Sequence, residues 1–359
     1  MSQQISRVKI SDIAKKANVS AGTVDRVIHN RGEVSQATRE KVLKIIKELN
    51  YQPDIVASSL ASKKSLRFSA ILPRGDADNP FWKIPVEGLQ IALDEIKHFG
   101  ITLEKYHFIY HNRQSFSRMF TKVLESKPDG IIVTPFFRTE TRNFLDQANQ
   151  KNIPVVFLNT FIEGTKSFAF VGQDSKQSGR VAAELLDYGL DSTKEILILN
   201  IISEKSGNAH ILSREEGFRD YFQIENPQRP LKSIQVKARH VDELGKELSS
   251  CFLSANKSPC AHGVFVTNSK VFLVADFFEK NNIRNVQLIG YDLLDSNIDH
   301  LKKGNIRFLI GQKPVDQGYK SLMTLFNALF MKKKIQQDQY LPIDIITKEN
   351  LDFYLHHKK

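Results

Sequence analysis

Apolar and polar positions alternate with helical spacing in the first fifty residues of the chain. Apolar side chains recur every three or four positions over 10–17, which predicts a first amphipathic helix. Ser20 is placed to cap a second helix that runs to about His29, and a third helix follows Ser35. Two short helices about a tight turn, braced by a third, predict a helix-turn-helix, whose second helix normally enters the major groove of DNA.

From Leu66 onward, short apolar runs alternate with amphipathic stretches. The runs predict strands at 67–72, 130–134, 154–158, 168–171, 195–201, 262–266, 286–290 and 307–311. The stretches predict helices at 81–98, 139–150, 175–188, 213–223, 270–280 and 315–332. Alternation of this kind predicts parallel sheets covered by helices on both faces. Because nearly 300 residues are too many for one small sheet, we expect two lobes.

The composition is typical of a folded globular protein. Of the 359 residues, 41% are hydrophobic and 25% charged, and no apolar run approaches the ~18–20 residues that a membrane span needs. The first residues lack the apolar segment of a secretory signal, so we expect a cytoplasmic protein without membrane contact. Cys251 and Cys260 are too few for a disulfide framework, and no Cys/His cluster has zinc spacing, so we expect no metal or other cofactor.

Positive charge is concentrated at the N-terminal end. The whole chain carries a net charge of +11, which indicates an anionic partner. Residues 1–64 contain twelve Lys and Arg against six Asp and Glu, a net charge of +6, and the other 295 residues carry the remaining +5. A basic segment joined to a nearly neutral body is typical of a small nucleic-acid-binding module, although charge alone fits a solvated helical segment equally well.

Residues 8–64 resemble the DNA-binding head of the lactose-repressor (LacI) family. The resemblance rests on the DIAKKANVS turn, on TV-x-RV in the second helix, on VSQATREKV, and on LNYQP followed by VASSLA. It implies a helix-turn-helix head at 1–53 and a hinge helix or linker at 54–65. It also implies a homodimer whose two heads bind the half-sites of a pseudo-palindromic operator in double-stranded DNA.

The same resemblance implies which residues contact DNA. Ala21, Gly22 and Arg26 match the base-reading positions, and the guanidinium of Arg26 can grip guanine O6 and N7 together. Asp25 departs from the family's usual serine, and either accepts from cytosine N4 or pairs with a neighbouring cation. Leu60 matches the leucine that wedges a central base step, although an ordinary linker is the alternative. The other implied contacts are Ser20, Thr23, His29, Asn30, Tyr51, Val56 and Ala57.

The body, residues 66–359, resembles the type I periplasmic sugar-binding-protein fold that LacI-family effector domains share. The chain would therefore combine an α-helical head with an α/β body of two doubly wound parallel-sheet lobes. The resemblance implies an N-lobe of about 66–173 and 313–340 and a C-lobe of about 174–312 and 341–359. A ligand of such sheets lies beyond the carboxyl ends of the strands, between the lobes.

Several residues that follow the strands match ligand positions of this fold. Asn79, Phe81 and Trp82 resemble the segment whose amide fixes a hydroxyl and whose rings stack on a sugar face. Taken alone, a Phe-Trp pair at the start of a helix is more often part of a core, and each polar residue is equally able to cap a loop. The other implied ligand contacts are Asn159, His210, His240, Asn268, Asp292 and Gln312.

We therefore expect a LacI-type transcription regulator, a repressor in its simplest form, controlled by a sugar or a sugar derivative. Leu212 stands where sugar-binding relatives carry an arginine and His240 where they often carry an aromatic ring, so a nucleobase or a sugar phosphate is the alternative ligand. An effector-dependent activator or a co-repressor response is the alternative mode. The basic head argues against a periplasmic receptor, and no nucleophile elbow, phosphate-binding glycine loop or metal spacing indicates an enzyme.

Overall fold

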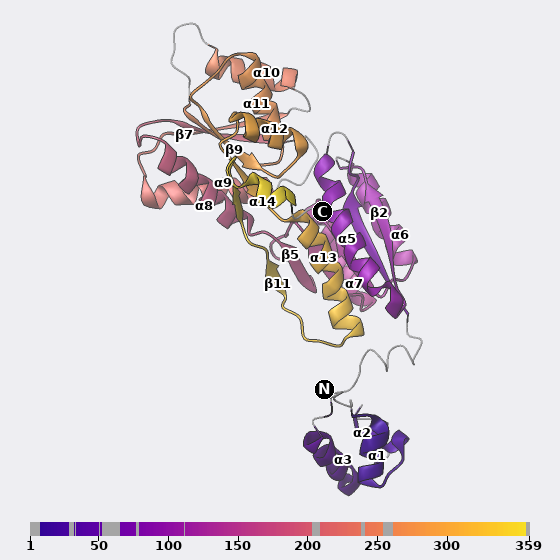
Figure 1. Ribbon diagram of the computed structural model, residues 1–359. Helices are drawn as coiled ribbons and strands as arrows, with labels where there is room; N and C mark the ends of the chain where they lie inside the picture. The colour runs from indigo at the N-terminus through magenta and orange to yellow at the C-terminus, as the bar shows by residue number, and fades with distance from the viewer. Residues whose placement is uncertain are drawn as a thin grey trace. The chain divides into compact units, whose positions relative to one another are not determined.

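The computed structural model of the chain separates into two units, Met1–Lys64 and Ser65–Lys359. Figure 1 shows a small helical unit at the N-terminal end and a larger unit built of two sheets with helices. The structure describes residues 8–28, 32, 34–49, 51, 65–76, 79–110, 112–202, 209–237, 241–253 and 261–356.

The small unit, here called the head, contains three helices around one core. The helices are α1 (Ile10–Ala17), α2 (Ala21–Ile28) and α3 (Gln36–Glu48). Apolar side chains of all three helices are buried against one another, and these are Ile13, Ala14, Ala17, Val24, Val27, Val42 and Ile45. The predicted helix-turn-helix with its third bracing helix is confirmed, because the apolar periodicity of the sequence places these residues on the inner faces.

The first sheet of the large unit has the order β2-β1-β3-β4-β5-β11, and every neighbouring pair is parallel. Its strands are β1 (Leu66–Pro73), β2 (Ile101–Phe108), β3 (Gly130–Val133), β4 (Val155–Leu158), β5 (Ala169–Gly172) and β11 (Asp338–Tyr340). Its helices are α5 (Lys83–Ile96), α6 (Arg113–Glu125), α7 (Arg138–Gln150) and α13 (Pro314–Leu325). Helices α5 and α13 pack together on one side of the sheet, and α6 packs with α7 on the other (Figure 1).

The second sheet has the order β7-β6-β8-β9-β10-β12, and only its edge strand β12 runs antiparallel to its neighbour. Its strands are β6 (Ile196–Ile202), β7 (Leu231–Lys237), β8 (Gly263–Val266), β9 (Gln287–Tyr291), β10 (Phe308–Gly311) and β12 (Asp344–Ile346). Its helices are α8 (Ser175–Gly189), α9 (Ala209–Glu225), α10 (Val241–Phe252), α11 (Val271–Lys280), α12 (Asp295–Lys303) and α14 (Leu351–His356). The α/β class and the two-sheet architecture agree with the prediction.

Four strands lie outside the predicted set, and all four are at sheet edges: β2, β7, β11 and β12. None of the four is buried at every position, whereas β3, β4, β5 and β8 are. An edge strand is covered less completely and so keeps polar residues, and a search for continuous apolar runs passes over it. Helices α6, α10, α12 and α14 are also absent from the predicted set. The predicted helix 315–332 divides into α13 and a π-helical turn at Phe326–Phe330.

In the lobe built on the second sheet, helices α8 and α9 make a very close contact through glycine residues. A Cβ atom added at Gly179 of α8 would lie 2.0 Å from the backbone oxygen of Arg214, and one added at Gly217 of α9 would lie 1.8 Å from that of Lys176. Glycine is therefore required where α8 and α9 approach, and this contact sets the position of α9 relative to the second sheet.

Three segments connect the two sheets. They follow β5, β10 and β11, and the backbone N–H of Leu341 donates to the oxygen of Gly172 at 2.8 Å. The buried amide of Gln173 donates to the Gly311 oxygen at 2.9 Å and to the Pro342 oxygen at 3.5 Å. One side chain thus ties all three connections together, and it holds the two sheets as neighbours around the space between them.

Two further observations bear on the compositional expectations. Within the described ranges, no helix is both long enough and apolar enough to cross a bilayer. Cys251 of α10 is disulfide-bonded, a crosslink that the count of only two cysteines did not lead us to expect.

Candidate functional site

The turn between α1 and α2 sets the direction of the second helix of the head. Asn18 adopts a left-handed backbone with φ 55°, and the N–H of Val19 donates to the oxygen of Ala14 at 3.0 Å. Ser20 then caps α2, because its Oγ accepts the N–H of Thr23 at 3.1 Å and lies 2.9 Å from the Thr23 hydroxyl. The predicted cap is confirmed, and Thr23 is held by this cap on the first turn of α2.

The outer face of α2 carries the residues that we expect to read bases. Ala21, Gly22 and Arg26 are exposed, whereas Val24 and Val27 of the same helix are in the core. A Cβ atom added at Gly22 would meet only the Ser20 hydroxyl, at 3.7 Å, so the fold of the head does not require glycine there. The role of Gly22 in reading bases stays a prediction.

Five predicted DNA contacts, His29, Asn30, Val56, Ala57 and Leu60, lie outside the described residues, and so does one predicted ligand residue, His240. Asp25 and Tyr51 are described and partly buried, and each makes an interaction with other groups. The role of Asp25 toward cytosine or toward a cation stays a prediction.

Eight of the nine predicted ligand residues line one cavity in the large unit. The cavity is open to solvent, and its empty volume of about 590 Å³ includes the solvent at its mouth. Its wall combines residues that follow strands of both sheets. The predicted residues in this wall are Asn79, Phe81, Trp82, Asn159, His210, Asn268, Asp292 and Gln312.

Asn159 and Asp292 occupy equivalent turns in the two lobes. Asn159 follows β4 and Asp292 follows β9, and both have a left-handed backbone, with φ of 70° and 71°. Asn and Asp adopt this conformation more readily than other non-glycine residues. Their backbone N–H groups donate to the next strand, to Val171 at 2.9 Å and to Ile310 at 3.0 Å. Each turn therefore presents one polar side chain to the cavity.

Arg214 of α9 is a buried cation in the same wall. It is 2% exposed, its Nη1 donates to the Thr267 oxygen at 2.8 Å, and its Nη2 donates to Gln312 Oε1 at 2.7 Å. The guanidinium also lies over the ring of Tyr291, an arrangement that stabilises a desolvated cation. Gln312 Nε2 donates to both oxygens of Asp292, at 3.0 and 2.9 Å. The amide of Gln312 thus bridges the guanidinium and the carboxylate.

Burial sets the charge of two titratable groups in the cavity. It raises the pKa of Asp292 to about 6, although the charge of Arg214 and the hydrogen bond from Gln312 both lower it. Burial and the charge of Arg214 lower the pKa of His210 to about 3. At pH 7 the wall therefore holds an ionised Asp292, a cationic Arg214 and a neutral His210, whose buried Nδ1 has no hydrogen-bond partner among the residues that the structure describes. These groups are suited to a ligand with several polar atoms.

Aromatic rings form another part of the wall. Phe81 and Trp82 meet edge to face with ring centroids 5.1 Å apart, and Trp82 packs against Phe136 at 5.7 Å. Both are largely buried and belong to the core of the first lobe, yet they also line the cavity. The core interpretation and the ligand interpretation of this pair are therefore compatible.

Asn268 has the capping role that we gave as its alternative. Its Nδ2 donates to the Ile201 oxygen at 2.6 Å, and its Oδ1 accepts the N–H of Lys270 at 3.1 Å. These two bonds hold the loop between β8 and α11. They use one of the two amide hydrogens of Asn268.

Two segments of the chain match known families. Residues 9–54 match the lacI family of bacterial regulatory proteins, and residues 70–334 match the periplasmic binding protein domain. A ribose operon repressor from Halalkalibacterium halodurans is 30% identical over 290 residues, which are 79% of this chain and 80% of that protein. The chain belongs to the LacI family of bacterial regulatory proteins.

Other relatives agree with this membership. Catabolite control protein A of Staphylococcus xylosus is 33% identical over 196 residues, covering 46% of this chain and 56% of that protein. A structure from Bacteroides fragilis described as a LacI transcriptional regulator is 30% identical, has a TM-score of 0.74, and covers 81% of this chain and 100% of its own. A glucose-galactose binding protein from Geobacillus stearothermophilus, 23% identical with a TM-score of 0.69 over 80% of this chain and 99% of its own, shares the fold.

One expectation for this LacI-family chain is wrong. We expected an arginine to be missing because Leu212 occupies its place, but Leu212 is 60% exposed and the cavity contains Arg214. Helix α9 begins at Ala209 rather than at residue 213, so His210 and Arg214 lie one helical turn apart and both reach the cavity. Their i, i+4 spacing is the signal in the sequence that identifies Arg214.

Other lining residues were also missed. Tyr110 lines the cavity just beyond the end of β2, and it escaped prediction because β2 itself did. The remaining residues of the wall follow or precede predicted ones closely in sequence, and these are Pro80, Ser269, Lys270, Phe272 and Leu294.

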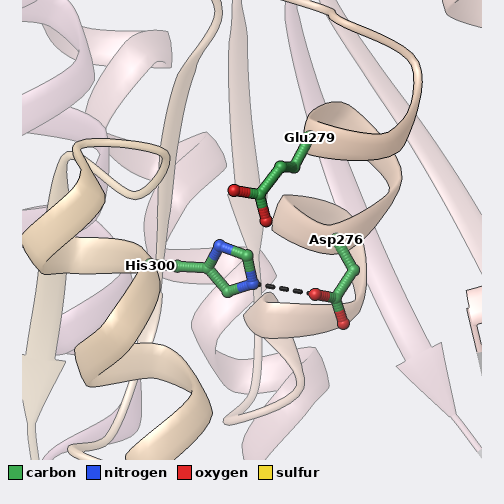
Figure 2. A group of neighbouring side chains, drawn as sticks. All are labelled: Asp276, Glu279 and His300. Atoms are coloured by element: carbon green, nitrogen blue, oxygen red, sulfur yellow. Dashed lines mark hydrogen bonds and ion pairs between the residues drawn. The ribbon is translucent and has the colours of Figure 1, made fainter.

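Outside the cavity, one group of side chains has the donor types of a metal site. Figure 2 shows Asp276 and Glu279 on α11 facing His300 on α12. His300 Nε2 lies 2.9 Å from Asp276 Oδ1, and its Nδ1 lies 3.0 Å from the amide nitrogen of Asn305. The ammonium of Lys303 lies 3.0 and 3.2 Å from the two oxygens of Glu279. Because each of these groups already has a partner, the arrangement is best explained as an ion-paired clamp between two helices.

Proposed function

We propose that this LacI-family regulator binds a sugar, or a similar polyhydroxylated molecule, in the cavity between its lobes and that binding changes its affinity for operator DNA. One observation carries the proposal: the cavity joins a buried carboxylate, Asp292, and a buried guanidinium, Arg214, to the aromatic edge formed by Trp82. Sugar hydroxyls need paired donors and acceptors, and sugar C–H faces pack on rings. The ribose operon repressor among the relatives supports a sugar ligand.

The head supports a repressor that acts on DNA in the cytoplasm. Exposed Ala21, Gly22 and Arg26 lie on the outer face of α2, and residues 1–64 carry a net charge of +6. We propose that two heads bind the half-sites of a pseudo-palindromic operator and that the paired hinge segments bind at its centre. An effector that changes the closure of the lobes then changes the spacing of the hinges, which couples effector affinity to DNA affinity.

We propose a homodimer, supported by an apolar surface at the junction of the lobes. Ile91 of α5 and Phe353 of α14 are 48% and 72% exposed, and both line a broad groove whose empty volume is about 2030 Å³. Large exposed apolar side chains that gather in one groove are typical of a protein interface. Ile91→Asp should convert the dimer to a monomer in size-exclusion chromatography with light scattering, and Leu212→Asp, on an exposed part of α9, serves as the control.

A sugar phosphate is the second candidate ligand. Lys270 lines the cavity together with Arg214, so the wall contains two cationic side chains, and its predicted ligand residues include one carboxylate, Asp292. An anionic group gains charge-assisted hydrogen bonds from such a pair.

A calorimetric titration tests the proposal and separates the candidates. The purified protein is titrated with D-ribose, D-arabinose, D-galactose, D-glucose, ribose 5-phosphate and adenine. Binding of a neutral sugar that is lost in Asp292→Ala supports the proposal, and binding of adenine alone contradicts it. Preference for ribose 5-phosphate favours the second candidate. Recovery of the ligand unchanged after incubation distinguishes a receptor from an enzyme.

A further inference from the structure

Gln317 of α13 contacts two cavity residues from behind. It is fully buried and is not part of the cavity wall. Its Oε1 accepts a hydrogen bond from Asn159 Nδ2 at 3.0 Å, and its Nε2 donates to the backbone oxygen of Gln312 at 2.8 Å. Gln317 therefore links the first-lobe turn that presents Asn159 to the connection between the lobes that presents Gln312.

The direction of these hydrogen bonds follows from groups whose polarity cannot be reversed. A backbone carbonyl only accepts, so the amide nitrogen of Gln317 must face Gln312, and its oxygen must face Asn159. Asn159 can satisfy that oxygen only with its own nitrogen. The amide of Asn159 is thereby oriented with its hydrogens directed toward Gln317 at 3.0 Å and toward Gln312 Oε1 at 3.5 Å.

The orientation of the Gln312 side chain is determined in the same way. Arg214 only donates, so Gln312 Oε1 must face the guanidinium, and an ionised Asp292 only accepts, so Nε2 must face the carboxylate. Both ends of this amide are engaged within the protein. Although Gln312 lines the cavity, its hydrogen-bonding groups are committed to Arg214, Asp292 and Asn159.

The atoms that Asn159 and Asp292 offer to a ligand are acceptors. Among the described residues, Asn159 Oδ1 accepts one long hydrogen bond, from the Thr160 hydroxyl at 3.3 Å, which leaves a further lone pair. The carboxylate oxygens of Asp292 also retain lone pairs beyond their bonds to Gln312. A ligand group placed here must bring hydrogens.

We propose that Gln317 and Gln312 are positioning residues that determine effector specificity by orienting Asn159 and Asp292 as acceptors. The inference rests on the proposed function, since it concerns the same cavity. It implies that the effector presents neighbouring hydroxyl groups as donors at this end. Groups that only accept, such as a phosphate, a carboxylate or a carbon-bound fluorine, are rejected there, because a buried acceptor opposite another acceptor loses its hydration without a replacement.

The first test needs no ligand. The side-chain amide protons of Asn159, assigned in a nitrogen-15 NMR spectrum by their loss in Asn159→Ala, should exchange slowly with solvent in the wild type. In Gln317→Met, which keeps the length of the side chain and removes both polar atoms, they should exchange at least about tenfold faster. The matched control is Thr324→Val, since Thr324 is a buried polar residue of the same helix whose hydroxyl bonds Lys320 and Gln339 but no group of Asn159. Fast exchange in the wild type would overturn the proposal.

The second test measures effector specificity as a ratio of affinities. D-ribose and its monodeoxyfluoro analogues are titrated into wild type, Gln317→Met and Thr324→Val. At one ring position the wild type should prefer the hydroxyl by about tenfold or more, because a site built to bond a hydroxyl rejects the analogue that lacks its hydrogen. The preference should fall in Gln317→Met and persist in Thr324→Val.

The outcomes are distinguishable. An equal preference in wild type and Gln317→Met overturns the positioning role. Failure of D-ribose and all its analogues to bind the wild type counts against the proposed function, and the exchange measurement then decides the inference about Gln317 by itself.

Discussion

The guanidinium carbon of Arg214 lies 3.6 Å from the centroid of the Tyr291 ring, with both side chains buried in the second lobe. The tyrosine hydroxyl is in turn 3.0 Å from the hydroxyl of Ser178 on α8. Together with the hydrogen bonds to Thr267 and Gln312, this contact holds the cation in one orientation. Arg214 is therefore positioned before any ligand binds, which limits the entropy that binding must cost.

Arg214→Lys tests whether this planar cation is required. The ammonium of a lysine cannot donate to both Thr267 and Gln312 with the fixed planar geometry of a guanidinium. Each hydrogen bond to a charged group contributes about 1.5–3 kcal/mol. We expect a lower melting temperature and at least about tenfold weaker binding of D-ribose in calorimetry. Leu212→Ala, at the exposed position two residues earlier, should change neither. Wild-type affinity in Arg214→Lys would show that the guanidinium does not contribute to the site.

Gly179→Ala tests the close contact between α8 and α9. The added Cβ atom would lie 2.0 Å from the backbone oxygen of Arg214, so α9 must shift. We expect a loss of about 1–3 kcal/mol in the free energy of unfolding, measured with urea, as for other overpacked interiors. Sugar affinity should fall as well, because the displaced backbone carries Arg214. Gly304→Ala is the control, since that position has open space but a φ of 81°, which strains any residue with a side chain. It should reduce stability without weakening sugar binding.

The pKa of Asp292, which burial raises to about 6, predicts how sugar affinity changes with pH. Ligand hydroxyls donate to the ionised carboxylate, which predominates above pH 6 and is replaced by the neutral acid as the pH falls. Because apparent affinity scales with the competent fraction, D-ribose should bind about tenfold more weakly at pH 5 than at pH 7. Titrations at both pH values, with circular dichroism to show that the fold persists, measure this. Asp292→Asn should bind weakly with little pH dependence, and an unaltered profile in that variant would assign the titration to another group.

Arg26→Ala tests base reading by α2. The exposed guanidinium at this position should contribute about 1–3 kcal/mol at a single base pair and much less to nonspecific binding. Fluorescence anisotropy on the operator and on single-base variants provides the measurement. Lys44→Ala, at an exposed position of α3, should lower the affinity for all these DNA sequences equally or leave it unchanged. Uniform weakening by Arg26→Ala would mean that Arg26 contacts only phosphate.

The elements that the sequence predicts well are those whose environment is uniform. The head helices and the central strands such as β4 and β8 are amphipathic or fully buried, so their apolar patterns are clear. The edge strand β2 has mixed exposure, and its omission concealed Tyr110 at its end. Helix α9 begins four residues before its predicted start, and that shift concealed Arg214.

Within the cavity, residues that follow central strands, such as Asn159 and Asp292, could be anticipated because parallel strands end at a common edge. The direction of their hydrogen bonds could not, since it depends on Gln317. This glutamine is 158 residues from Asn159 in sequence, and its contact exists only after α13 packs on the first lobe. A helical glutamine has no local pattern that distinguishes such a role.

Coupling between the cavity and operator DNA can be measured in a single binding experiment. An operator selected from random-sequence DNA by the full-length protein is titrated, by fluorescence anisotropy, with wild type and with Asp292→Ala, each in the absence and presence of saturating D-ribose. We expect ribose to change the operator affinity of the wild type by about 5–150-fold, the usual range of coupling between two sites, and to leave Asp292→Ala unchanged at the affinity of the ligand-free wild type. If calorimetry shows ribose bound in the wild type while operator affinity stays the same, the cavity does not control DNA binding. That result would contradict the proposed coupling between sugar and operator.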